Sequence, residues 1–529
     1  MVATPLSATA PKDDLAVRYV SARIAEIGER DRDALTGYVK LYRQAPDSEI
    51  LADRLFDSAI RSGDMATAVR AARAIELRNA GSNETALVLF ADAWRQKNWK
   101  LADLAADRLG QGQNLTFMSP MLKSWVRVAQ GLNADLPEAD PEADGLFAYY
   151  SADQRIYLDL ASGRLARAKL GLRDIATQSG DHVRDVMIAG AATLAASGGD
   201  SDFADALMRS ANGSPDGLVA GPAKLPADRG LAALYGRIAS ALIEQDMPEE
   251  GLTMARIGHW ISPAQTNVAI TLAGAMHANR MTAEALNLLA QQSLTSPYRL
   301  NILESRVDLL LASADVAGAR AAVAQAMQAQ PNSVALKLLS ARVEEADGNM
   351  GLVTASYREM TEAADFAELP VRQQASYRLL LAAALDRAGD WPAARSELEK
   401  LLIVDPNNAQ ALNYLGYSLL ERNGASDAAI AFVERAHRLE PTSSAITDSL
   451  GWAYYLRGDV ASAIPLLEKA AKAAVSDVAI NEHLGDAYWA YGRRREARFA
   501  WRAARLGSDG EDAVRLSEKI DIGLSDGRR

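Results

Sequence analysis

The sequence predicts an all-α protein built from repeated helical hairpins that stack into a solenoid. Alanine, the strongest helix former, accounts for 102 of the 529 residues. Strand signals are almost missing, because the Asn-Gly pairs at Asn212 and Asn423 lie between helical patterns and not between alternating apolar residues. A period of 34 to 35 residues recurs along the chain. Such a period is typical of stacked helix pairs and unusual for a globular domain with one core.

Composition excludes several classes of function. The net charge of −11 argues against a nucleic-acid-binding protein, which normally needs a basic face. No cysteine is present, so disulfides, thiolate metal sites and cysteine nucleophiles are excluded. The first 14 residues show no basic start followed by an apolar run, and no stretch is typical of a membrane span. We therefore expect a soluble protein, cytoplasmic by default, with no indication of membrane contact.

The period is clearest in three segments near the C-terminus, "NYLGYSLLERNGASDAAIAFVERAHRLEP", "DSLGWAYYLRGDVASAIPLLEKAAK" and "EHLGDAYWAYGRRREARFAWRAARL". Their leading glycines, Gly416, Gly451 and Gly485, are 35 and 34 residues apart. Each segment then has an alanine on its predicted second helix, at Ala429, Ala463 and Ala497. Two helices approach closely only where side chains are small, so these positions are expected to be helix crossings. Pro406 and Pro441 are expected to end a second helix and turn the chain into the next pair.

This pattern of Leu-Gly, aromatic, Ala, Ala and Pro resembles the tetratricopeptide repeat (TPR). The resemblance implies a right-handed superhelix whose first helices line a concave groove that takes a segment of another protein. Extended backward, the 34-residue frame gives about 12 to 14 repeat units, in which 12 of 14 aligned positions are Ala or Gly. Those positions are Ala34, Ala68, Ala102, Ala168, Ala206, Gly251, Ala285, Ala319, Ala394, Ala429, Ala463 and Ala497, and the exceptions are Leu136 and Val353.

The repeats are degenerate toward the N-terminus, where Phe56, Phe90 and Ile156 replace the small residue of the first helix. Three segments break the frame. One is acidic with two prolines, one is rich in Gly and Pro, and a shorter insertion at 361–371, "TEAADFAELPV", lengthens one repeat interval. Each is a loop or interrupted helix, or alternatively a hinge or docking loop. The resulting division is a disordered tail (1–14), degenerate repeats (15–130), an acidic loop (131–146), degenerate repeats (147–212), a Gly/Pro-rich loop (213–230), repeats (231–365), well-matched repeats (371–510), and a capping helix with a tail (511–529).

Signatures of catalysis are not found. The sequence has no Gly-Lys dipeptide and hence no P-loop. Its five histidines are scattered over separate repeats without the spacing of paired metal ligands. We therefore expect no catalytic residue, no cofactor and no metal, and a protein that is not an enzyme.

The groove implied by the resemblance would expose an acidic strip interleaved with aromatic residues. Aromatic side chains bury a large area at small entropic cost and make good anchors for a partner. The expected partner is a protein segment with basic and apolar residues. The alternative for the two tryptophans is packing between repeats. The candidate groove residues are Asn413, Tyr417, Glu421, Asp448, Trp452, Tyr455, Glu482, Asp486 and Trp489.

A second candidate patch lies on the last second helix, at Arg493, Arg494, Arg495, Arg498 and Arg502. These arginines either cover the end of the core with their aliphatic stems or form a docking patch for an acidic partner or an anionic lipid surface.

The C-terminal block also resembles a group of proteobacterial TPR proteins, some of them associated with the envelope and one branch acting as adaptor of a carboxyl-terminal processing protease. The lipid-anchoring cysteine of such members is missing here. The group would imply a periplasmic or envelope location if the natural chain starts earlier. The leading hypothesis is an adaptor or scaffold, and the alternative is a permanent structural or assembly subunit of a larger, possibly envelope-associated complex.

Overall fold

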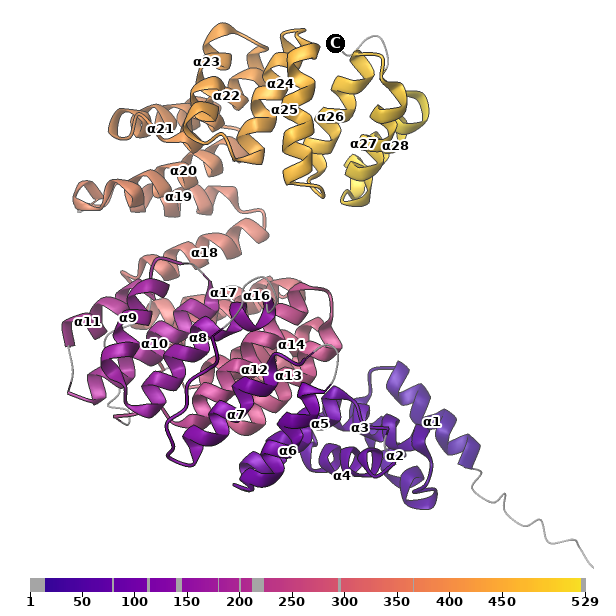
Figure 1. The fold of residues 1–529 in the computed structure, drawn as a ribbon. Coiled ribbons are helices and arrows are strands. Elements are labelled where there is room, and N and C mark those ends of the chain that lie inside the picture. Colours follow the sequence, from indigo (N-terminus) through magenta and orange to yellow (C-terminus); the bar gives the residue numbers. More distant parts are fainter. Residues whose placement is uncertain are drawn as a thin grey trace, which may run out of the picture. The chain divides into compact units, whose positions relative to one another are not determined.

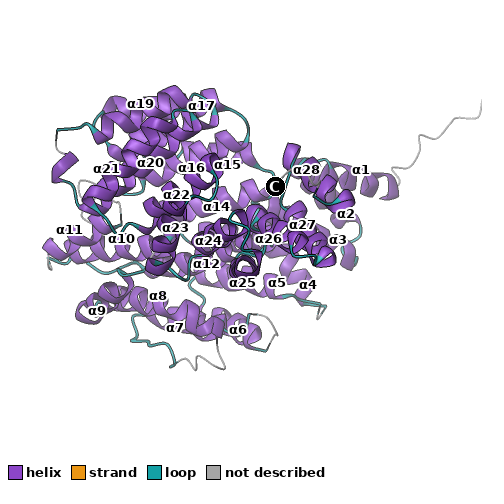
Figure 2. Cartoon of the chain, turned by 90° about the horizontal axis from the view of Figure 1, so that it is seen from above, coloured by secondary structure: helices purple, strands orange, loops and turns teal. Residues whose placement is uncertain are grey.

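The computed structural model describes residues 15–78, 80–111, 115–138, 145–178, 180–198, 201–211, 223–293, 296–364 and 366–524. Within these ranges every regular element is a helix, as Figures 1 and 2 show, and no strand occurs. The prediction of an all-α protein is confirmed. The predicted tail at 1–14 and residues 213–222 of the predicted Gly/Pro-rich loop lie outside the described residues.

The chain divides into two compact units, residues 1–323 and 324–529. The helices of unit 1 are α1 (Leu15–Ile27), α2 (Asp31–Gln44), α3 (Glu49–Ser62), α4 (Met65–Glu76), α5 (Asn83–Arg95), α6 (Trp99–Gly110), α7 (Met118–Ala129), α8 (Gly145–Ser162), α9 (Leu165–Ile175), α10 (Asp181–Ala196), α11 (Ser201–Ser210), α12 (Ala227–Glu244), α13 (Pro248–Ile261), α14 (Thr266–Ala278), α15 (Thr282–Ala290) and α16 (Arg299–Ala312). The boundary between the units falls within α17 (Val316–Ala329).

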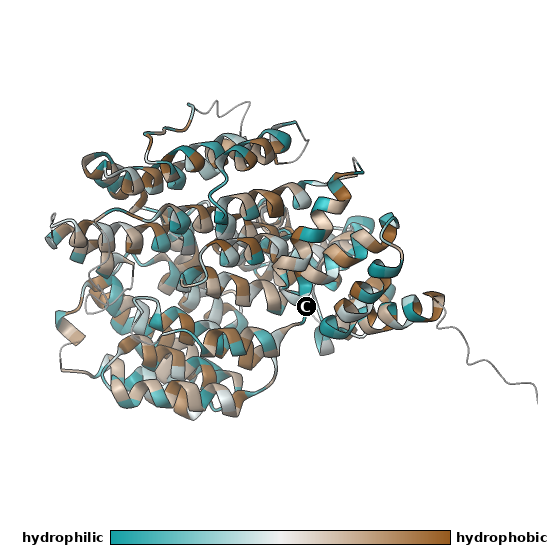
Figure 3. Ribbon diagram, turned by 90° about the horizontal axis from the view of Figure 1, so that it is seen from below, coloured by the Kyte–Doolittle hydropathy of each residue, from teal (hydrophilic) through white to brown (hydrophobic). Residues whose placement is uncertain are grey.

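Unit 2 continues with α18 (Val334–Ala346), α19 (Met350–Thr361), the short 3-10 helix η2 (Phe366–Glu368), α20 (Val371–Arg387), α21 (Trp391–Val404), α22 (Ala409–Asn423), α23 (Asp427–Leu439), α24 (Ser444–Leu456), α25 (Val460–Ala473), α26 (Val478–Ala490), α27 (Arg494–Leu506) and α28 (Gly510–Ile522). Apolar and polar residues interleave along the helices in Figure 3, as expected where each helix buries one stripe. Helix α21 ends two residues before Pro406 and α23 two residues before Pro441, as expected from the two prolines.

The small residues of the 34-residue frame lie where the hairpins are packed. Ala34, Ala68, Ala102, Ala168, Gly251, Ala285, Ala319, Ala394, Ala429, Ala463 and Ala497 are all buried. The prediction for Ala206 is wrong, because that residue is exposed on α11 and Ala204 is buried in its place. The frame slips by two residues there. Val353, one exception to the small-residue pattern, is fully buried on α19.

Three glycines of the well-matched repeats lie against the second helix of their own hairpin. A Cβ added at Gly416 would come within 2.6 Å of Val433 Cγ2, and one at Gly451 within 2.7 Å of Leu467 Cγ. A Cβ at Gly485 would collide with the ring of Trp501. The helices therefore cross at a distance that leaves no room for a side chain on the first helix.

The register of these crossings can be tested at Ala463, which is fully buried on α25 and faces Gly451 through its carbonyl. We expect Ala463→Leu to lower the free energy of unfolding by about 1–3 kcal/mol, because the added carbons have no space at the crossing. The matched control is Ala461→Leu, two residues earlier on the same helix, where the side chain is exposed. Thermal unfolding followed by circular dichroism measures both variants. Equal midpoints would contradict the register.

Unit 1 contains packing between helices that are far apart in the sequence. Helix α13 packs against α3 and α5, and α12 packs against α7 and α8. The indole N–H of Trp94 on α5 donates a hydrogen bond to Asp228 Oδ1 on α12 (2.8 Å). Arg256 of α13 donates from Nη2 to the carbonyl oxygen of Arg61 at the end of α3 (2.7 Å). The early hairpins of unit 1 are therefore held by α12 and α13 as well as by their sequence neighbours.

The segment 131–138 lies where the repeat frame would place a second helix after α7, and it is not helical. We call residues 132–138 the strap. Its Ala134 and Leu136 side chains are buried, so the large residue that broke the frame at position 136 occupies a core position without helical structure. Residues 139–144 of the predicted acidic loop lie outside the described residues, and α8 begins at Gly145.

Candidate functional site

The candidate groove residues lie on α22, α24 and α26, the first helices of three consecutive hairpins. Each of these helices starts at a polar cap whose side chain accepts a hydrogen bond from a backbone N–H in the first turn. Asn408 accepts from Ala411 (3.0 Å), Ser443 from Ile446 (3.4 Å) and Asp477 from Ile480 (3.0 Å). The recurring caps start the three helices at the same point of the repeat, so equivalent residues come to one side.

Six side chains from these helices meet, and we call them the first-helix cluster: Tyr417, Glu421, Asp448, Trp452, Tyr455 and His483. Trp452 is at the centre. Its ring stacks on His483 with centroids 4.0 Å apart and on Tyr455 at 4.8 Å, and its indole N–H donates to Glu421 Oε1 (2.7 Å). The ring of Tyr417 lies 6.4 Å from His483. Tyr417, Trp452, Tyr455 and His483 are partly exposed, and Glu421 is exposed.

Asp448 is the buried acid of the cluster, with 5% of its surface exposed. Its Oδ2 accepts a hydrogen bond from His483 Nδ1 (2.9 Å). Its Oδ1 is buried and has no hydrogen-bond partner among the described residues. Burial raises the pKa of Tyr417, and the charges of Glu421 and Asp448 raise it further, so this phenol stays neutral as a hydrogen-bond donor. Asn413 lies one turn earlier on α22, and its Oδ1 is also buried without a partner in the described structure.

The remaining three candidates on α26 are covered by α28. Glu482 and Asp486 are buried, with 8% and 6% of their surfaces exposed. Lys519 of α28 donates to Glu482 Oε1 (2.6 Å) and to Asp486 Oδ2 (2.7 Å), and Arg515 pairs with Glu482. The other carboxylate oxygen of Asp486, Oδ1, accepts a hydrogen bond from the buried indole N–H of Trp501 (2.9 Å).

Trp489 lies in the same covered region. Its ring is 5.4 Å from that of Trp501, and a Cβ added at Gly523, after the end of α28, would collide with it. The structure thus separates the candidate set. Trp452 contributes to a partly exposed cluster, whereas Trp489 packs against α27 of its own hairpin and against Gly523 after the last helix. A binding role for Glu482, Asp486 and Trp489 stays a prediction, and it would require α28 to move.

Two groups of this region were missed by sequence reasoning. His483 was classed with the scattered histidines, although it joins Asp448 to the ring of Trp452. The basic residues of α28 were not connected with the acids of α26. The spacing could have revealed the contact between α28 and α26, because Arg515 stands 33 residues after Glu482, one repeat further along the stack.

The arginine patch on α27 also contains both residues engaged in packing and residues exposed to solvent. Arg493 pairs with Glu468 (3.0 Å) and Glu496 (3.1 Å), and Arg498 donates to the carbonyl oxygen of Ile520 (2.8 Å). Arg494 and Arg498 also lie over the ring of Trp489. Arg494, Arg495 and Arg502 are exposed on α27. Part of the patch therefore holds the end of the stack together, and a docking role of the exposed part stays a prediction.

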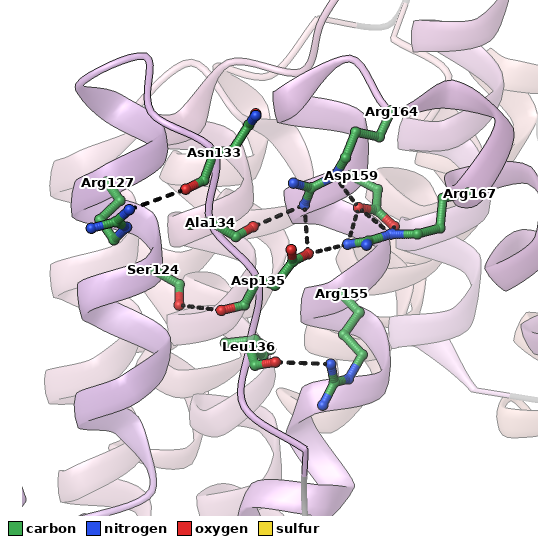
Figure 4. Close-up of polar contacts among 10 residues, drawn as sticks. All are labelled: Ser124, Arg127, Asn133, Ala134, Asp135, Leu136, Arg155, Asp159, Arg164 and Arg167. Carbon is green, nitrogen blue, oxygen red and sulfur yellow. Dashed lines mark hydrogen bonds and ion pairs between the residues drawn. The ribbon is translucent and has the colours of Figure 1, made fainter.

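The strap, a further candidate for docking, forms several polar contacts within unit 1 (Figure 4). Asp135 pairs with Arg164 (3.2 Å) and Arg167, which also bind Asp159. The hydrogen bond from Arg167 lowers the pKa of Asp135. Arg155 donates to the carbonyl oxygen of Leu136 (3.1 Å) and Arg164 to that of Ala134 (2.8 Å). The only strap carboxylate drawn in Figure 4 is thus already neutralised by its own unit.

Two further properties limit the chemistry of the described ranges. Within them, no three His, Asp or Glu side chains gather in an arrangement that could hold a metal ion. Among the helices that the structure describes, none combines the length and the apolar character that a membrane span needs.

Comparison with known proteins supports the repeat. A TPR repeat-containing protein of Pseudomonas aeruginosa is 34% identical to the chain over 101 residues, which are 19% of this chain and 17% of that protein. The shared stretch is thus less than a fifth of the relative's length. Three observations thus point to the same kind of repeat: this homology, the 34-residue period, and the close helix crossings at Gly416, Gly451 and Gly485.

Over these 101 residues a TPR repeat-containing protein is thus a homologue of the chain. No family model matches it. The solved structures similar to this chain include yeast Tom70, with 15% identity and a TM-score of 0.40 over 95% of this chain and 99% of Tom70. The APC/C hetero-tetramer Cut9-Hcn1 covers 97% of each chain at 13% identity with a TM-score of 0.35. MamA matches 35% of this chain and 92% of its own, at 20% identity with a TM-score of 0.26.

Proposed function

We propose that the chain is an adaptor or scaffold that binds a segment of another protein at the first-helix cluster. The observation that carries this proposal is the combination of partly exposed rings with carboxylates that lack a cation. Tyr417, Trp452 and Tyr455 present aromatic surface beside Glu421 and Asp448. Neither carboxylate forms an ion pair with a lysine or arginine in the described part of the chain. An incoming segment can therefore supply both apolar contact and positive charge.

This arrangement favours a partner segment with basic residues next to apolar or aromatic ones. The rings would provide most of the binding free energy, because they bury area on contact. The exposed carboxylate of Glu421 would contribute mainly to the rate of association. Salt screening limits the range of its electrostatic attraction to about 8 Å at physiological ionic strength.

The alternative within the same fold is a permanent subunit of a larger complex. The resemblance of the C-terminal block to an envelope-associated group makes an envelope complex one setting for either role. A wash with moderate salt distinguishes the adaptor from the permanent subunit. An adaptor releases its partner at moderate salt, whereas a permanent subunit is expected to elute as a stoichiometric complex after the same wash.

The proposal is tested on the partner that copurifies with the full-length chain from its native cells. We expect Trp452→Ala to weaken binding of that purified partner by about 1–3 kcal/mol, mainly through faster dissociation, because an aromatic anchor is lost. We expect Glu421→Lys to slow association, with an effect that disappears at high salt. Surface plasmon resonance at two salt concentrations measures both rates.

Controls come from the same unit. Glu399→Lys makes the same charge change at an exposed residue of α21, and Phe499→Ala removes an exposed aromatic ring from α27. Each variant must keep the helical circular dichroism of the parent. If folded Trp452→Ala and Glu421→Lys bind as the parent does, the first-helix cluster is not the binding site. A loss confined to Phe499→Ala would move the site to α27.

A further inference from the structure

Two acids at equivalent positions of consecutive repeats are in different states. Glu482 of α26 and Asp448 of α24 stand 34 residues apart, and both are buried. Glu482 is neutralised by two cations of α28, Lys519 at 2.6 Å and Arg515. Among the described residues, the ion-pair partner of Asp448 is His483 of the next first helix, at 2.9 Å. The end of the stack therefore shows what chemistry this position accepts when a basic helix is present, namely an ammonium or a guanidinium group.

Within the described structure, one oxygen of Asp448 has no hydrogen-bond partner. Its Oδ1 is buried and accepts no hydrogen bond from the described residues, while Oδ2 is occupied by His483. A buried carboxylate without its full set of donors is costly, so such groups are rare unless a ligand completes them. Asp448 Oδ1 thus lacks a donor, whereas the carboxylate at the equivalent position one repeat later has two cationic donors.

The groups around Asp448 also suit a cation. The ring of Trp452 stacks on His483 at 4.0 Å, and the ring of Tyr417 lies 6.4 Å from the same imidazole. Both rings are partly exposed, and electron-rich ring faces attract ammonium and guanidinium groups. Glu421, held at the indole N–H of Trp452, adds a second negative charge to the same surface.

We propose that Asp448, Trp452 and Tyr417 form a recognition site for a single lysine or arginine side chain of the partner segment, a proposal that rests on the function proposed above. The cation lies against the rings and donates to Asp448 Oδ1. His483 is the gate of this site, because its imidazole covers the carboxylate and must turn aside for the cation to reach it. Removal of the imidazole therefore opens the site, whereas removal of the charge of Asp448 abolishes it.

The test uses the full-length chain labelled with 5-fluorotryptophan, in which the ¹⁹F resonance of Trp452 is assigned by its loss in Trp452→Phe. The probes are N-acetyl-lysine methylamide and N-acetyl-arginine methylamide, with N-acetyl-norleucine methylamide as the uncharged control. We expect the two cationic probes to shift the Trp452 resonance saturably, and the norleucine probe to leave it unchanged at the same concentration. Asp448→Asn keeps the shape of the side chain and is expected to lower the affinity for the two cationic probes at least tenfold.

Two more variants decide the mechanism. His483→Ala is expected to bind the cationic probes more tightly than the parent does. Glu399→Gln, which removes an exposed carboxylate from α21, is expected to bind them as the parent does. Equal shifts by the lysine and norleucine probes, or equal affinity in Asp448→Asn and the parent, would overturn the cation site. Weaker binding in His483→Ala would overturn the gate and make the imidazole a part of the site.

The outcome is separable from that of the proposed function. If the cation site is wrong while the adaptor function is right, Trp452→Ala still releases the copurified partner and Asp448→Asn does not. If the adaptor function is wrong, both variants keep the partner, whatever the small probes do.

Discussion

Replacing Lys519 with methionine is expected to weaken the attachment of α28 by roughly 3–5 kcal/mol, since it leaves the buried carboxylate of Asp486 without its cation. Lys519 contacts both Glu482 and Asp486, whose side chains are 10% and 9% exposed. Methionine keeps the length and the apolar stem of lysine, so the loss isolates the charge. Arg515 still pairs with Glu482, whereas the one donor that Asp486 keeps among the described residues is the indole N–H of Trp501.

Hydrogen exchange with mass spectrometry measures this loss directly on peptides of α27 and α28. Exchange through opening of α28 should accelerate on the order of a hundredfold or more, because each 1.4 kcal/mol corresponds to a factor of ten. Lys472→Met is the matched control, because Lys472 is exposed on α25. Adding Asp486→Asn to Lys519→Met should restore part of the protection, because it removes the unpaired charge. Identical exchange in the lysine variants would show that the buried pairs do not hold α28.

In unit 1, Trp125→Ala is expected to lower the free energy of unfolding by about 3–5 kcal/mol or more. Trp125 of α7 is fully buried, and its indole N–H donates to Gln154 Oε1 of α8 (2.8 Å). Its ring also fills the space where a Cβ at Gly230 of α12 would lie. Truncation therefore leaves a cavity among three helices and a buried amide without its donor.

Two further variants show how much of this loss of stability comes from the hydrogen bond and how much is specific to the buried position. Trp125→Phe keeps an aromatic ring and removes the donor to Gln154, so it is expected to cost about 1–3 kcal/mol. Leu101→Ala, at a half-exposed position of α6, is expected to change stability by about 0.5 kcal/mol. Urea unfolding followed by circular dichroism gives the values. A Trp125→Ala variant no less stable than Leu101→Ala would mean that α7, α8 and α12 do not meet at this ring.

The helical hairpins could be predicted from the sequence because their cause is local. Small residues are required at close crossings, so Gly451 and Ala463 reveal their role through spacing alone. The frame gave the wrong residue at Ala206, where the buried alanine is Ala204. Buried positions on a helix tolerate Ala at several neighbouring places, so composition does not fix the register when the second helix is short.

The candidate site was less predictable. Spacing placed Asp448 and Glu482 in one class, but it could not tell that a later helix covers one of them. That difference depends on Lys519, which is 37 residues away from Glu482 and reaches it only after α28 has folded back on α26. His483 was missed for a related reason. Its importance comes from a stacked ring and a carboxylate on α24, and no motif within its own helix marks it.

The packing of α12 and α13 against the early hairpins has a consequence for how this chain can vary in length. In unit 2 the main helix contacts join neighbouring repeats, so a repeat could be gained or lost by duplication or deletion with most other contacts kept. In unit 1 the hydrogen bond from Trp94 to Asp228 bridges 134 residues and that from Arg256 to Arg61 bridges 195. Removing a single repeat between these partners would shift one relative to the other and break both links. The repeat number of unit 1 is therefore fixed by its geometry, whereas unit 2 is free to diversify in length.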